Sequence, residues 1–334
     1  MTTRHARVRV PASTSNLGAG FDCVGLAVDR WLTASATVRQ AGGGGGEGEG
    51  RGEGSGQSVV VNRAGRLAVV TLPSEQDLLY RGFQAACHAA GVSWSGDLTI
   101  DANSEIPVGY GLGSSAAAVV AGALLANATL GLALPRERLV TIGAGIDGHP
   151  DNVAPALYGG CLLVVRMPGG GLHVTVLVVA PQLEFLIALP PFPSDTKAAR
   201  AALPDAVPFK DAALAVSRAA ALVQGLATGD GALLALALED VLHVPYRRGG
   251  VPGYDDVVRA ARAAGAYGAT LSGAGSGVLA IAPRAAADQV GRALLDAWRA
   301  VGITAELLRF SRPAAGASVL HAPHSTHPAP LETT

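Results

Sequence analysis

The sequence predicts an α+β protein with two layered halves. The first half alternates short apolar strands with helices, and its longest apolar run, residues 116–134, suits a buried helix. The second half is mostly of helical periodicity, with one strand, glycine turn and strand at 269–283. A chain of 334 residues holds about two domains of roughly 150 residues each, and we predict their boundary near residue 165.

Each element follows from apolar periodicity and from the glycines and prolines that interrupt it. Strands are predicted over residues 7–11, 24–40, 58–62, 66–72, 97–104, 159–167, 171–180, 183–189, both arms of 269–283, and 305–310. Helices are predicted over residues 78–91, 116–134, 135–144, 197–203, 211–228, 230–243, 254–266 and 285–302.

Two segments have too few apolar residues to offset the entropy of ordering them. Residues 41–57 combine glycine with charged residues and are predicted to form a flexible hairpin insertion. Residues 313–334 are rich in Pro, His, Ala and Thr and are predicted to form a disordered tail. The predicted domains are therefore 1–165, with the insertion, and 166–312.

Composition excludes several classes of function. A formal net charge of −1 gives no basic footprint for nucleic acid, so a small-molecule partner is expected. Residues 116–134 approach the length of a membrane span, but Asn127 and Thr129 interrupt them, which favours a buried helix and no membrane partner. Three separated cysteines and no apolar leader predict a reduced, cytoplasmic protein without a disulfide framework or zinc site.

The segment PVGYGLGSSA, residues 107–116, carries the clearest chemical signal. Three glycines let backbone N–H groups converge on a ligand, and Ser114 and Ser115 stand where the next helix begins. These features predict a triphosphate site, with the hydroxyls free for phosphate or magnesium. The alternative is a plain strand-to-helix connector with a serine N-cap. Neither the P-loop nor the dinucleotide fingerprint matches, because no lysine precedes Ser114 and the glycines are spaced G-x-G-x-G.

Together with three other segments, this loop resembles the homoserine kinase family of the GHMP small-molecule kinases. The segments are VPASTSNLGAGFDCVGLAV (10–28), the loop itself, GHPDNVAPALYGG (148–160) and LSGAGSGVLA (271–280), and they occur in the family's order. The resemblance implies an N-terminal domain like ribosomal protein S5 and a ferredoxin-like C-terminal domain. It also implies a homodimer that uses ATP and Mg²⁺ to phosphorylate L-homoserine in threonine biosynthesis. Another GHMP kinase, or a non-catalytic nucleotide sensor of this fold, stays an alternative.

The resemblance also implies a substrate pocket for a zwitterion with a hydroxyl. The positions that match the family's substrate residues are Asn16, Asp22, His149, Asn152, Arg200 and Arg247. Asp22 would hold the ammonium group, and two arginines would hold the carboxylate through their planar forks. Asn152 and Arg247 would align the hydroxyl, and no side chain would remove its proton fully.

Several of these assignments have competing interpretations. Asp22 could cap a turn, His149 could be a structural hydrogen-bonding residue, and the two arginines could be solvated helix charges. Arg248 competes with its neighbour for the second carboxylate position. Asp151 could be a base or a structural cap, and the residues alone do not choose between these roles.

The nucleotide assignments follow the same resemblance. Phosphate-binding positions are Pro107, Val108, Gly109, Tyr110, Gly111, Leu112, Gly113, Ser114, Ser115, Ala116, Gly273, Ala274 and Gly275. Ser115 and Asp147 are the expected magnesium ligands. The family usually has a glutamate before G-H-P-D-N, whereas Asp147 is the only carboxylate close by in this chain.

Overall fold

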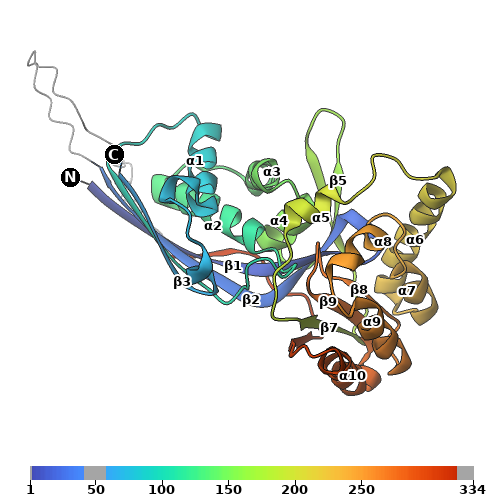
Figure 1. Ribbon diagram of the computed structural model, residues 1–334. Coiled ribbons are helices and arrows are strands. Elements are labelled where there is room, and N and C mark those ends of the chain that lie inside the picture. Colours follow the sequence, from blue (N-terminus) through green and yellow to red (C-terminus); the bar gives the residue numbers. More distant parts are fainter. Residues whose placement is uncertain (1, 41–57, 322–334) are drawn as a thin grey trace, which may run out of the picture.

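The computed structural model describes residues 2–40 and 58–321, and two sheets organise this part of the chain (Figure 1). The larger sheet has the order β11-β1-β2-β4-β3, and β5 and β6 extend it from β2. Its strands are β1 (Thr2–Asn16), β2 (Gly20–Gln40), β3 (Ser58–Gly65), β4 (Asp97–Ser104), β5 (Cys161–Arg166), β6 (Leu172–Leu177) and β11 (Ser318–His321). All its pairs are antiparallel except β3 with β4.

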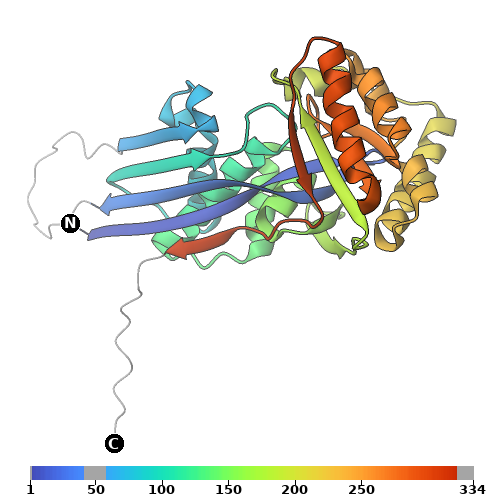
Figure 2. The ribbon, with the colours of Figure 1, turned by 90° about the horizontal axis from the view of Figure 1, so that it is seen from below.

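Four helices cover one face of this sheet, and Figure 2 shows its strands in front of them. They are α1 (Leu78–Ala89), α2 (Ser114–Leu130), α3 (Arg136–Asp147) and α4 (Pro150–Tyr158). Because α2 is buried along almost its whole length, its small residues must allow close helix packing. A Cβ atom on Gly122 would lie 1.9 Å from the backbone oxygen of Leu79 in α1. Among the described helices none is long and apolar enough to cross a membrane.

The smaller sheet is antiparallel, with the order β10-β7-β9-β8. Its strands are β7 (Leu183–Leu189), β8 (Gly268–Leu271), β9 (Val278–Pro283) and β10 (Glu306–Phe310). The helices of this half are α5 (Thr196–Ala201), α6 (Phe209–Thr228), α7 (Gly231–Ala237), α8 (Val244–Arg247), α9 (Tyr254–Ala263) and α10 (Ala287–Ala300). Short 3-10 turns lie at Arg66–Val69, Ser74–Gln76, Arg248–Gly250 and Arg284–Ala286. A buried cluster that includes Val257, Leu294 and Trp298 joins α9 and α10 to this sheet.

The α+β prediction is confirmed, and three local predictions are wrong. Residues 66–72 were expected as a strand, but β3 ends at Gly65 (φ 63°), and Leu67 is the one buried residue in the 3-10 turn that follows. Of the helix expected over 230–243, only α7 forms, and it ends at Ala237. The Asp240 carboxylate then accepts backbone N–H groups of the turn that follows, which ends the helical hydrogen bonding.

The third correction concerns the predicted tail, 313–334. Residues 318–321 form β11, which pairs with β1 and so extends the larger sheet by one strand. Backbone bonds between Ala314 and Ala27, and between Gly160 and Ala314, fix the approach to this strand. The glycine insertion at 41–57 and residues 322–334 lie outside the described residues. The larger sheet also takes in β6, so it extends past residue 165, and the exact domain boundary stays a prediction.

The close contact of α1 with α2 predicts different effects of two Gly→Ala substitutions. Gly122→Ala should lower the free energy of unfolding by about 1–3 kcal/mol, because its methyl group would collide with backbone. Gly145→Ala in α3 is the control, since no atom lies within 4 Å of its Cβ position. There we expect a gain of about 0.5–1 kcal/mol in helix propensity. Urea denaturation measures both, and equal effects would contradict the packing argument.

Candidate active site

The loop before α2 leaves the start of that helix open to a cavity. Helix α2 begins at Ser114, and its N-cap is Gly113, in the left-handed conformation (φ 62°) and without a side-chain cap bond. The serine N-cap of the connector alternative is therefore wrong. The hydroxyls of Ser114 and Ser115 make no hydrogen bond with the part of the chain that the structure describes. Free N–H donors and two free hydroxyls thus face one cavity.

Close backbone contacts explain two glycines of this loop. A Cβ atom on Gly111 would lie 1.9 Å from the backbone oxygen of Ser272, and one on Gly113 would lie 2.0 Å from Oγ of Ser13. Both glycines have positive φ, which residues with a side chain rarely adopt. The loop can therefore touch both neighbours only with glycine at these positions.

Hydrogen bonds join the loop to two of the other segments singled out from the sequence. Oγ of Ser272 donates to the backbone oxygen of Gly111 at 2.7 Å and lies 2.9 Å from Oγ1 of Thr14. Nδ2 of Asn16 donates to the backbone oxygen of Gly273 at 2.9 Å. Segments near residues 14, 111 and 272 are thereby fixed to one another.

Asn152 is held by the same first segment. Its Oδ1 accepts a hydrogen bond from Ser13 at 2.9 Å, and its Nδ2 donates to Oγ of Ser15 at 2.8 Å. These two bonds define the orientation of the amide. Asn152 lines the same cavity as Ser114, so its amide stands beside the anion site.

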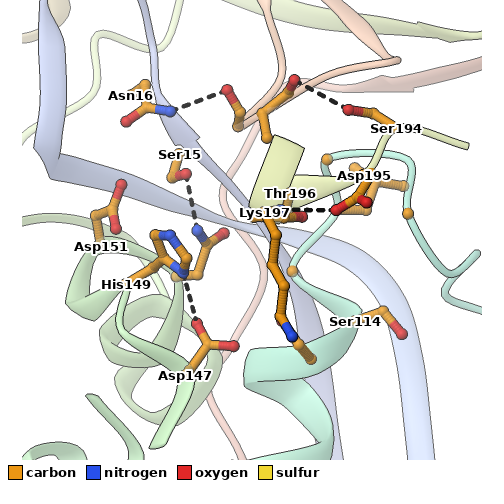
Figure 3. A pocket seen from close by; sticks show the side chains of 18 of the residues that line it. Ser15, Asn16, Ser114, Asp147, His149, Asp151, Ser194, Asp195, Thr196 and Lys197 are labelled. Carbon is orange, nitrogen blue, oxygen red and sulfur yellow. Dashed lines mark hydrogen bonds and ion pairs between the residues drawn. The ribbon is translucent and has the colours of Figure 1, made fainter. Parts of the chain in front are cut away.

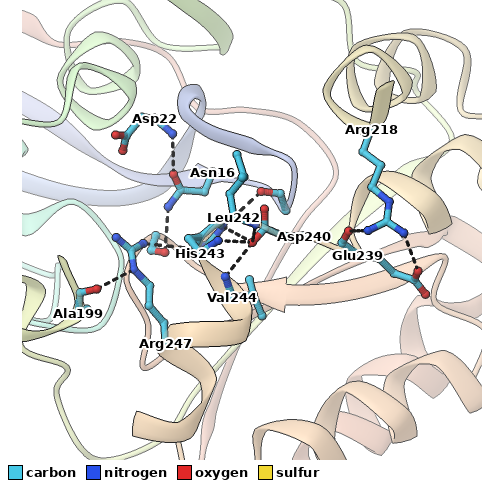
Figure 4. Close-up of polar contacts among 12 residues, drawn as sticks. Asn16, Asp22, Ala199, Arg218, Glu239, Asp240, Leu242, His243, Val244 and Arg247 are labelled. Carbon is cyan, nitrogen blue, oxygen red and sulfur yellow. Dashed lines mark hydrogen bonds and ion pairs between the residues drawn. The ribbon is translucent and has the colours of Figure 1, made fainter. Parts of the chain in front are cut away.

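Asp22 and Arg200 form a bidentate ion pair. The two guanidinium nitrogens donate to the two carboxylate oxygens at 2.9 and 2.6 Å. Asp22 has a φ of 56°, and Oδ1 of Asn16 accepts its backbone N–H at 3.0 Å (Figure 4). Asn16 thus fixes the backbone at Asp22, and a helix of the other half of the chain binds its carboxylate.

Arg247 lies beside this pair. It is 7% exposed and donates through Nε to the backbone oxygen of Ala199 at 3.1 Å. The guanidinium carbons of Arg247 and Arg200 lie 5.3 and 5.4 Å from the centre of the Phe21 ring. Burial, and then the charge of Arg200, lower the pKa of Arg247. Two guanidinium groups and one carboxylate are therefore gathered around one aromatic ring.

The structure separates Arg247 from its neighbour in the sequence. Arg248 makes an exposed ion pair with Asp255 at 2.8 Å and does not line the cavity. A buried scaffold positions Arg247, because Oδ2 of Asp240 accepts the N–H groups of His243 and Val244 at 2.6 and 2.7 Å (Figure 4). The His243 ring stacks on Phe21 with centroids 4.9 Å apart, and burial lowers its pKa to about 4.

Asp147 and His149 form a second polar pair on the cavity wall. Oδ2 of Asp147 lies 3.5 Å from Nδ1 of His149, and this contact raises the pKa of the histidine. The Asp147 side chain is 3% exposed, and Ser115 lines the same cavity. No cluster of three metal-ligating side chains exists among the described residues. One carboxylate and one hydroxyl that line the same cavity nevertheless fit magnesium bound to a nucleotide, because Mg²⁺ keeps waters and phosphate oxygens as its other ligands.

Asp151 is the most buried carboxyl of the cavity, at 1% exposure. Its Oδ1 has no hydrogen-bond partner among the described residues, and Ser15 bonds to the carboxyl. Burial, assisted by the charge of Asp22, raises the pKa of Asp151 to about 7. It is not the N-cap of α4, which is His149, so the capping role is not supported.

These residues line one open cavity of about 340 Å³ (Figure 3). Of the residues expected from the sequence, those on its wall are Asn16, Asp22, Val108, Gly109, Gly111, Leu112, Gly113, Ser114, Ser115, Asp147, His149, Asn152, Arg247, Gly273 and Ala274. Those not on it are Pro107, Tyr110, Ala116, Arg200 and Gly275, although Arg200 reaches it through Asp22.

Comparison with known proteins agrees with this geometry. Two family models match the chain, the GHMP kinases N terminal domain over residues 77–160 and the GHMP kinases C terminal over residues 222–300. A homoserine kinase of Microchaete diplosiphon is 37% identical over 315 residues, which cover 94% of this chain and 97% of the relative. The chain belongs to the homoserine kinase family.

Further members of the homoserine kinase family support the match. A homoserine kinase of Gloeobacter violaceus is 39% identical to this chain. The aligned residues cover 87% of this chain and 92% of the relative. The structure of homoserine kinase from Cytophaga hutchinsonii superimposes on this one with a TM-score of 0.81 at 27% sequence identity. The match covers 95% of this chain and 97% of the chain in that structure. The predicted two-domain GHMP kinase fold is therefore confirmed.

Several residues around this cavity were not predicted from the sequence. Phe21, which lies under both arginines, sits inside the segment SNLGAGFD, but its role there depends on helices far along the chain. Asp240 and His243 were assigned to a helix. An Asp three residues before His243 and four before a Val-Pro pair is a capping signal that could have revealed them.

The buried carboxyl of Asp151 predicts how stability depends on pH. Because its pKa is about 7 when folded and about 3.9 when unfolded, the folded protein binds the extra proton between these values. Its contribution is therefore lost as pH rises toward 7. Between about pH 5 and pH 8, wild type should lose about 1–3 kcal/mol of unfolding free energy relative to Asp151→Asn.

Urea denaturation at a series of pH values measures this difference. Asp205→Asn is the control, since Asp205 is exposed and should leave the pH profile unchanged. Parallel profiles for wild type and Asp151→Asn would show that the buried carboxyl does not take up the proton.

Proposed function

We propose that this chain transfers the γ-phosphoryl group of ATP to the side-chain hydroxyl of L-homoserine, giving ADP and O-phospho-L-homoserine in threonine biosynthesis. The observation that carries the proposal is the charge arrangement of Asp22, Arg200 and Arg247 beside the glycine loop. One carboxylate and two guanidinium groups complement the ammonium and the carboxylate of an amino acid. On binding, the ammonium group of the substrate would pair with Asp22 and its carboxylate with Arg200, in place of the Asp22–Arg200 ion pair.

The remaining residues have distinct roles in this proposal. The N–H groups and hydroxyls at the start of α2 would hold the phosphates. Asn152, oriented by Ser13 and Ser15, would align the substrate hydroxyl together with Arg247. Asp147 and Ser115 would hold Mg²⁺, which supplies charge neutralisation for the phosphates when bound.

No side chain is required to remove the hydroxyl proton before transfer. Phosphoryl transfer depends mostly on positioning and electrostatic stabilisation. Asp151, whose pKa burial raises to about 7, is partly protonated near neutral pH, so part of the protein would lack an ionised base there. We infer that the proton leaves as the phosphorus–oxygen bond forms. The cytoplasmic location and the homodimer stay predictions.

An ADP-release assay with homoserine, mevalonate and galactose tests the proposal. We expect turnover with homoserine alone, because the other two alcohols have no ammonium group for Asp22. Turnover with mevalonate or galactose would indicate another GHMP kinase. ATP binding without turnover on any of them would indicate a nucleotide sensor.

The carboxylate role of Arg247 predicts a substrate-dependent effect. Arg247→Gln should lower kcat/KM for homoserine about 10–150-fold, since a hydrogen bond to a charged group contributes about 1.5–3 kcal/mol. With 3-aminopropanol, which lacks the carboxylate, the same substitution should lower kcat/KM by a clearly smaller factor, because only the contact that aligns the hydroxyl is then lost. Steady-state kinetics on both substrates measure this, with Arg248→Gln as the matched control. Equal losses on both substrates would remove Arg247 from the carboxylate site.

A further inference from the structure

Lys197 lines the cavity without a function in the site described so far. It lies in the first turn of α5, and its side chain is exposed. That side chain makes no ion pair or hydrogen bond with the residues that the structure describes. Figure 3 shows it pointing along the cavity toward the first turn of α2, where Ser114 lies. An unpaired ammonium group is thus directed at the anion site.

The phosphate loop itself contributes no positive side chain. Residues 107–116 contain no Lys, Arg or His. Among the residues that line the cavity, Lys197 and Arg247 are the two that are always cationic at neutral pH, and Arg247 is engaged with the backbone of Ala199. Asp147 and Asp151 stand on the same wall. A triphosphate, with several negative charges, would therefore depend on Lys197 for direct pairing with a protein cation.

Hydrogen bonds and an ion pair hold both ends of helix α5 against the site, and these contacts position Lys197. Before the helix, the backbone N–H of Ser194 donates to the oxygen of Gly109 in the phosphate loop at 2.6 Å. At its other end, Arg200 is paired with Asp22, and Ala199 accepts from Arg247. Lys197 therefore stands between the nucleotide loop and the pocket for the acceptor. The transferred phosphoryl group must cross this region.

Composition sets Lys197 apart as well. The chain contains 23 arginines and only two lysines, Lys197 and Lys210. A lysine ammonium is a compact charge on a flexible stem, which can follow a phosphoryl group as it moves, whereas the arginine fork fixes a planar geometry. Lys210 lies exposed on α6 and does not line the cavity, and so offers a matched control.

We propose that Lys197 binds the γ-phosphoryl oxygens of ATP and stabilises them during transfer. This rests on the proposed phosphoryl transfer. The bond from the γ-phosphorus to the bridging oxygen breaks, and ADP keeps that electron pair. A new bond forms from the phosphorus to the substrate oxygen, whose proton leaves to solvent. Lys197 keeps its own proton throughout and acts through its charge.

Calorimetry with ADP and with the non-hydrolysable analogue AMP-PNP tests this role directly. Lys197→Met should weaken AMP-PNP binding at least about tenfold and change ADP binding less than about twofold, because only the analogue carries the third phosphate. Turnover with homoserine should fall about 10²–10³-fold, the loss typical of one such donor. Lys210→Met should match wild type in every measurement.

Three outcomes would overturn the assignment. They are equal weakening of ADP and AMP-PNP binding, unchanged AMP-PNP binding, and wild-type behaviour of a second variant, Lys197→Gln, which also removes the charge. Circular dichroism of each variant confirms that the fold is kept, as expected for an exposed side chain. Absence of homoserine turnover in wild type would refute the proposed function instead, and the nucleotide measurements would still decide the role of Lys197.

Discussion

The ion pair between Asp22 and Arg200 is the interaction on which the account of this site depends. Its partners are 178 residues apart in the chain, one near the start of β2 and one on α5. Side chains so distant form a bidentate contact only when the two halves of the chain meet at the site. The pair also places one negative and one positive charge side by side. That is the electrostatic pattern a zwitterionic amino acid would complement.

The backbone around this pair is constrained to an unusual degree. Asn16 and Asp22 both have positive φ, a conformation that residues other than glycine adopt rarely and at a cost. The amide of Asn16 compensates by bonding to the N–H of Asp22 and to the backbone oxygen of Gly273. One side chain therefore fixes the backbone that carries the Asp22 carboxylate and connects it to the third glycine segment. Together with Ser272 and Gly111, it links the acceptor pocket to the phosphate loop.

Much of this arrangement could be predicted from the sequence, because local patterns determine it. The start of α2 at Ser114 follows from glycines and an apolar run, and the family segments identified Asp22 and Arg247. The rest depends on contacts between distant segments. The strand expected at 66–72 is absent because Leu67 is the one buried apolar residue of this segment, and β11 forms by pairing with the edge of β1. Phe21 acquires its role solely from helices that meet above its ring.

A crystal structure with L-homoserine and AMP-PNP bound tests the central claim most directly. The account predicts that the Asp22–Arg200 ion pair opens, with the ammonium group on Asp22 and the carboxylate on Arg200 and Arg247. The hydroxyl should then face the terminal phosphate above Ser114. Homoserine bound elsewhere, with the ion pair intact, would contradict it.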